Sequence, residues 1–103
     1  MIHVIASIFV KENKMGQVLG IYERFAPKVN MEEGCLMYLP VLDYPTDIAT
    51  QVKDKNILTV IEKWETMDAF RAHLNAPHVI RFREDIKGVV EKVLIKVLKQ
   101  ALD

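Results

Sequence analysis

Four segments of the chain alternate with the two-residue period of a β-strand, yet they carry apolar side chains on both faces. Residues 2–10 place Val4 and Ile8 on one face, and Ile5 and Phe9 on the other. An amphipathic strand would be polar on one side, so this pattern is typical of strands that are covered on both sides. The same reading applies to three later segments, residues 35–42, 57–64 and 92–99.

The segments between these strands have helical periodicity. Apolar residues recur at steps of three and four from about residue 11 onward, which predicts an amphipathic helix. Thr66 is predicted to cap a short helix that ends at Leu74, and Pro77 to open a further helix that runs to about Val90. The resulting order, β-α-β-β-α-α-β, is that of a ferredoxin-like split βαβ domain of the α+β class, in which helices cover one face of a four-stranded antiparallel sheet.

A sheet with helices on one face only, whose strands are nevertheless apolar on both faces, needs a second covering layer. The remaining chain is too short to supply one, so a second copy is the simplest source. The sequence therefore predicts a homodimer in which the two sheets pack against each other.

Composition limits the functional classes. The 103 residues predict one domain spanning 1–103, and 14 Lys and Arg residues balance 14 Asp and Glu residues. No bulk charge is available to attract nucleic acid or a membrane surface, and no segment has the unbroken apolar run of a secretory signal or a membrane span. The lone Cys35 indicates a reducing compartment, so a cytoplasmic protein is predicted.

Three short stretches carry a family resemblance: residues 32–38 (EEGCLMY), 60–65 (VIEKWE) and 72–78 (AHLNAPH). In this order and spacing the chain resembles the antibiotic biosynthesis monooxygenase domain family, most closely its bacterial quinol monooxygenase branch. The resemblance implies a dimeric α+β barrel. It also implies a monooxygenase that acts on a small aromatic quinol or polyphenol with molecular oxygen and without a flavin or metal cofactor.

The same family is similar to heme-degrading monooxygenases, which carry an Asn on the first strand, a Trp on the third strand and a His on a later helix. Trp64 matches that Trp, but the first-strand position is Ser7 or Ile8, and the helix position has no His, which disfavours heme cleavage. An isomerase on the same fold and a non-catalytic dimeric module that binds small ligands stay open as alternatives, because a fold does not determine one function.

Three side chains are candidates for proton transfer. Glu62 shares a strand face with apolar residues, so it either pairs with an Arg or His or lies in a cavity with a raised pKa. His73 is the leading candidate for the base that removes a phenolic proton, and His78 is the second. The five-residue spacing between the two histidines is not that of a metal-ligand pair, so no metal site is predicted.

Aromatic and soft apolar side chains are candidates for a substrate pocket. Trp64 is either a core residue or an aromatic wall on which a planar substrate stacks. The remaining candidates fill the core or line the pocket for a flat ligand; they are Tyr38, Phe82, Phe70 and Met37.

Overall fold

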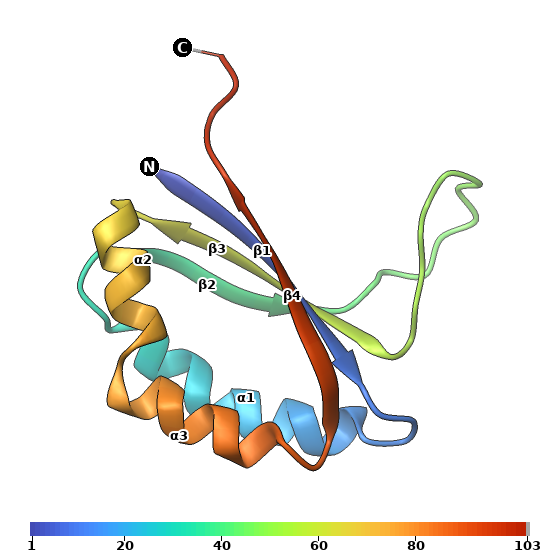
Figure 1. The fold of residues 1–103 in the computed structure, drawn as a ribbon. Coiled ribbons are helices and arrows are strands. Elements are labelled where there is room, and N and C mark those ends of the chain that lie inside the picture. The colour runs from blue at the N-terminus through green and yellow to red at the C-terminus, as the bar shows by residue number, and fades with distance from the viewer. Residues whose placement is uncertain (103) are drawn as a thin grey trace.

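The computed structural model describes residues 1–102 and has the predicted order of elements (Figure 1). The strands are β1 (Ile2–Val10), β2 (Cys35–Val41), β3 (Ile57–Trp64) and β4 (Val90–Leu98). The helices are α1 (Met15–Asn30), α2 (Met67–Leu74) and α3 (Pro77–Ile86).

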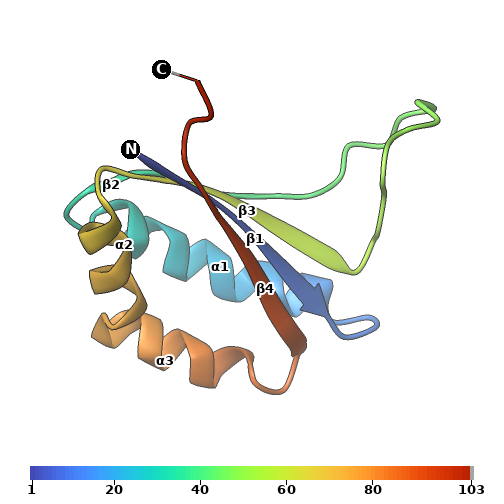
Figure 2. The same ribbon diagram turned by 45° about the horizontal axis from the view of Figure 1, so that its top comes forward.

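The four strands form one sheet in the order β2-β3-β1-β4, and every neighbouring pair is antiparallel. The three helices lie on one face of this sheet, and no helix or strand of residues 1–102 covers the other face (Figure 2). This arrangement confirms the predicted ferredoxin-like α+β fold.

The core lies between the sheet and the helices. The helix-facing residues of the two central strands are buried; they are Val4, Ala6, Ile8, Val10, Leu58, Val60, Glu62 and Trp64. From α1, Val18, Tyr22 and Val29 pack onto them. Burial of these apolar surfaces is the main favourable term in folding, and it fixes which face of each strand looks toward the helices.

The position of Pro40 in the sheet follows from its chemistry. Pro40 cannot donate a backbone hydrogen bond, and it is found in β2, which is an edge strand with an irregularity between Cys35 and Met37.

The last helix was predicted to reach Val90, but α3 ends at Ile86 and β4 begins at Val90. Lys87 and Gly88 form a tight turn here, closed by a hydrogen bond from the Val89 N–H to the Ile86 carbonyl, and this prediction of the helix end was wrong.

Gly34 forms the bend that leads into β2. Its φ is +81°, a left-handed conformation that favours glycine. A Cβ atom built on Gly34 would lie 2.5 Å from the Cβ of Ala69 on α2. The Gly34 carbonyl also accepts a hydrogen bond of 2.8 Å from the Glu65 N–H, so this bend joins the start of β2 to the end of β3.

Candidate active site

A cavity of about 160 Å³ lies on the helix side of the sheet, between β4, β3 and helices α2 and α3. Five of the eight residues predicted from the sequence line it: Tyr38, Glu62, Phe70, His73 and Phe82. Most of the remaining wall is apolar and includes Ile86, Val93 and Ile95. The structure thus brings an acid, an imidazole and several aromatic rings around one cavity.

Glu62 is the buried acid of this cavity, with 5% of its surface exposed. Its Oε1 accepts a hydrogen bond of 2.9 Å from the indole Nε1 of Trp64. Burial, with a smaller contribution from the negative charge of Glu32, raises the pKa of Glu62 to about 7, although the Trp64 hydrogen bond opposes the shift. Within residues 1–102 Glu62 has no ion-pair partner, so the structure supports the second of its two predicted environments.

His73 is held by a carboxylate that lies far away in the sequence. Its Nδ1 lies 2.9 and 3.1 Å from the two carboxylate oxygens of Glu32. A carboxylate accepts hydrogen bonds, so Nδ1 carries the proton and Nε2 is left as the basic nitrogen of a neutral ring. Burial lowers the pKa of His73 from its ordinary value, even though Glu32 opposes this, so the ring is neutral near pH 7.

Glu32 also binds the second candidate histidine. The Nε2 of His78 lies 2.7 Å from Glu32 Oε2, so one carboxylate orients both imidazoles. Glu32 follows α1, whereas the histidines belong to α2 and α3. It was not among the residues predicted for the site, because no periodicity or spacing links it to residues 41 and 46 positions away. Its place in the family stretch 32–38 was the one available signal.

Trp64 lies behind the wall of the cavity and packs against residues that line it. Its side chain is fully buried and is not part of the cavity wall. The indole ring lies 4.8 Å from the His73 ring and 6.0 Å from the Phe70 ring, measured between centroids. Of its two predicted roles the structure therefore shows the core residue, which additionally orients Glu62 through its N–H.

Met37 lies on the opposite face of the sheet from the cavity. It pairs with Lys63, whereas Tyr38 pairs with Glu62 on the helix side. His78 is also not part of the cavity wall. Met37 is therefore separated from the site, whereas His78 stays connected to His73 through Glu32 although it does not line the cavity.

Two tyrosines, together with Arg83, add polar groups to the lining of the cavity. Tyr38 on β2 was predicted, while Tyr22 on α1 was not, because it fits the helix periodicity of an ordinary core residue. Burial raises the pKa of both phenols above the ordinary value. Both hydroxyls therefore stay protonated near neutral pH, and they form a hydrogen bond with each other.

Two further structural findings concern residues 1–102. No three His, Cys, Asp or Glu side chains are arranged to hold a metal ion in this part of the chain. None of its helices is both long and apolar enough to cross a membrane.

Comparison with known proteins places the chain in a family. The model of the antibiotic biosynthesis monooxygenase family matches residues 1–85, which include every residue of the candidate site except Ile86 and the two on β4. The chain belongs to the antibiotic biosynthesis monooxygenase family. The chain is also similar to the "Probable quinol monooxygenase YgiN" of Escherichia coli strain K12, which is 31% identical over 104 residues, covering 99% of this chain and 100% of the relative.

Solved structures share this fold. A crystal structure of an antibiotic biosynthesis monooxygenase superposes with a TM-score of 0.83 at 24% identity, covering 99% of this chain and 100% of the other. The protein PA3566 from Pseudomonas aeruginosa gives a TM-score of 0.81 at 22% identity, covering 98% and 94%. At these levels of identity, the similarity shows that the fold is shared.

The raised pKa of Glu62 predicts a specific pH dependence of stability. Between its ordinary pKa of 4.5 and about 7, the folded chain keeps a proton on Glu62 that the unfolded chain releases. The free energy of unfolding therefore falls as the pH rises through this window, by up to about 3 kcal/mol. Glu62→Gln lacks this dependence, so its stability relative to wild type is expected to improve from about pH 5 to about pH 8 in urea unfolding experiments.

Glu65→Gln is the matched control, since Glu65 is exposed just after the same strand. Its difference from wild type is expected to stay constant over the same pH range. A Glu62→Gln difference that is equally flat would show that Glu62 ionises normally in the folded chain.

Proposed function

We propose that this family member oxidises a small aromatic quinol or polyphenol with molecular oxygen in the helix-side cavity, without a flavin or metal cofactor. The observation that carries the proposal is that the buried side chains of Glu62 and His73 line the same aromatic-lined cavity. Two titratable groups whose pKa values are pushed in opposite directions by burial are typical of a site that moves protons. The name of the Escherichia coli relative supports a quinol as the substrate class.

In the proposed reaction His73 acts as the base. Its Nε2 accepts the proton of a substrate hydroxyl, while Glu32 holds the ring through Nδ1 and stabilises the imidazolium that forms. The substrate anion is richer in electrons than the phenol and reduces oxygen directly. In monooxygenation of a quinol, one atom of O2 replaces a ring hydrogen and gives a hydroxyquinone, while the other oxygen atom leaves as water with two hydrogens taken from the substrate.

Glu62 and the tyrosines have supporting roles in this scheme. With a pKa of about 7, Glu62 is able to take up or return a proton near neutral pH. The hydrogen-bonded pair of Tyr22 and Tyr38 has one hydroxyl hydrogen left to donate to a substrate oxygen. Phe70 and Phe82 supply flat apolar surface for the ring, and the small volume of the cavity limits the water around it.

The test is to incubate chelator-treated protein with a panel of reduced quinols and polyphenols under oxygen-18 gas. Oxygen uptake and the isotope content of the products are then measured. Uptake above the spontaneous rate, with one labelled atom in the product, is the result expected for a monooxygenase. Uptake that yields hydrogen peroxide and unlabelled quinone would assign an oxidase. No uptake above the spontaneous rate with any of the compounds, together with saturable binding of one, would favour a non-catalytic binding module.

We also propose that two copies pair through the helix-free face of the sheet. The register places Ile5, Ile61 and Leu39 in one row across this face. Leu94 and Leu98 of β4 lie on the same face and are 54% and 38% exposed. Apolar side chains gathered on the face of a sheet favour burial against another layer, and a second copy supplies a matching surface.

Leu94→Lys is expected to convert the dimer, of about twice the 11.9 kDa chain mass, into a monomer, because a charge would then be buried at the interface. Sedimentation velocity measures the mass. Ile80→Lys is the control, since Ile80 is similarly exposed, at 52%, but lies on helix α3. A wild-type protein that sediments as a monomer would overturn the pairing.

A further inference from the structure

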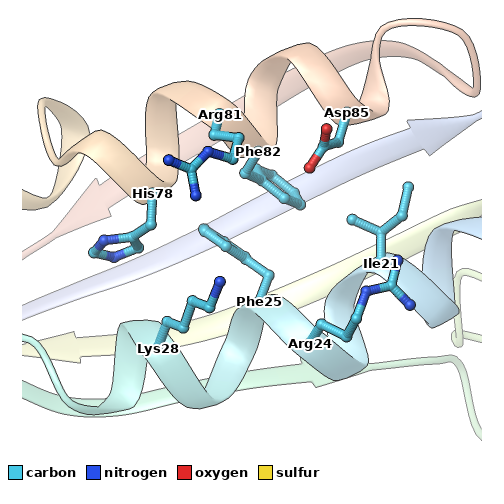
Figure 3. A pocket seen from close by; sticks show the side chains of 8 residues that line it. All are labelled: Ile21, Arg24, Phe25, Lys28, His78, Arg81, Phe82 and Asp85. Atoms are coloured by element: carbon cyan, nitrogen blue, oxygen red, sulfur yellow. The ribbon is translucent and has the colours of Figure 1, made fainter.

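A second, smaller cavity of about 110 Å³ lies in the groove between α1 and α3 (Figure 3). Its floor is the stacked pair Phe25 and Phe82, whose ring centroids are 3.9 Å apart with the planes inclined by 10°. Both rings also line the larger cavity, so the pair separates the groove from the candidate active site. His78 stands at one end of the groove.

Positive charge gathers around this floor. Arg24 and Lys28 come from consecutive turns of α1, and Arg81 comes from the facing side of α3 (Figure 3). In the described part of the chain none of the three takes part in a salt bridge or a side-chain hydrogen bond. The one carboxylate that lines the groove is Asp85, which lies at the end away from His78.

This local excess contrasts with the charge of the chain as a whole, which is zero. Like charges four residues apart on a helix repel each other, so Arg24 and Lys28 cost stability unless an anion lies near them. At the His78 end the neighbouring carboxylate, Glu32, is already held by both histidines. The three cations of the groove are exposed, and in residues 1–102 no carboxylate is paired with them.

We propose that the groove between α1 and α3 binds a small molecule through an oxyanion group, a carboxylate or a phosphate. Arg81 and Lys28 supply charge-assisted hydrogen bonds to the oxygens. The Phe25 and Phe82 rings offer an apolar surface beside them. A volume of about 110 Å³ accommodates a phosphate group or a small aromatic acid.

The experiment is a titration of the full chain with sodium phosphate and, separately, with sodium benzoate at constant ionic strength, followed by amide NMR shifts and by calorimetry. Saturable shifts of residues 21–28 and 78–85 are expected. Arg81→Gln is expected to weaken binding about tenfold, the loss of one hydrogen bond to a charged group. Arg71→Gln removes the same charge from the exposed surface of α2, outside the groove, and is expected to leave binding unchanged.

The two probes distinguish the two sources of the oxyanion. Tighter binding of benzoate would assign an aromatic carboxylic acid that uses the phenylalanine pair, and tighter binding of phosphate would assign a phosphate ester. Absence of saturable binding with both probes would overturn the proposal. So would an equal loss in Arg71→Gln, or shifts confined to the larger cavity around Tyr38 and Glu62. None of these outcomes depends on oxygen uptake, so this experiment tests the groove independently of the proposed oxidation reaction.

Discussion

His73→Gln is expected to slow quinol-dependent oxygen uptake by about 100- to 10 000-fold, the usual contribution of a positioned general base. Glutamine keeps a donor that is able to bind Glu32, but its amide does not accept a proton. The wild-type rate is expected to rise with pH and to level off below the ordinary histidine pKa, because burial lowers the pKa of His73. Initial rates over a pH series measure both effects.

His3→Gln is the control for this variant, since His3 lies near the start of β1 and pairs with Lys63 and Leu98 on the helix-free face, away from the cavity. Its rate is expected to match wild type. A His73→Gln protein that is folded, as judged by circular dichroism, and keeps more than about a tenth of the rate would exclude His73 as the base. If His73 is the base, His73→Gln is expected to lose the pH dependence of the rate as well as the rate itself. A purely structural role for His73 would lower the rate but leave its pH dependence unchanged.

The largest expected effect on stability comes from Gly34→Ala, which should lower the free energy of unfolding by about 3 kcal/mol. Alanine at a φ of +81° is strained, and its Cβ would lie 2.5 Å from the Cβ of Ala69, so α2 must shift. For a domain of this size the midpoint of thermal unfolding should fall by roughly 15 °C. Differential scanning calorimetry checks this.

Two further variants separate the causes of that loss. Gly20→Ala places a Cβ where no atom lies within 4 Å, inside α1, and is expected to stabilise the chain by about 0.5 to 1 kcal/mol. Adding Ala69→Gly to Gly34→Ala removes the close contact and should recover part of the stability. If Gly34→Ala is as stable as wild type, the close approach of β2 to α2 is not a constraint on this fold.

The fold was predictable because its signal is repeated along the chain. Strands β1 and β3 are apolar on both faces, and their helix-facing residues are the ones that the structure buries. The burial of Glu62 followed from the same alternation, since it stands between Val60 and Trp64 on that face. The end of α3 was less predictable, because Val89 and Val90 continue the apolar run beyond the turn at Gly88.

The site was only partly predictable, because its geometry depends on contacts between distant residues. The alternation of β2 placed Met37 and Tyr38 on opposite faces, and the register shows Tyr38 alone beside Glu62. Whether Trp64 would line the cavity or lie behind it depended on how α2 packs. Glu32 belongs to a turn, where no periodicity marks a side chain as inward or outward, so its position between two histidines required the three-dimensional structure.

The stacked Phe25 and Phe82 rings form a partition with a compartment on either side. Shortening either ring would enlarge both compartments at once and would join them into a single passage from the outer groove to His73. Attempts to broaden the substrate range through these two positions would therefore also alter which anions the groove admits. The selectivity of the two compartments cannot be adjusted independently at this partition.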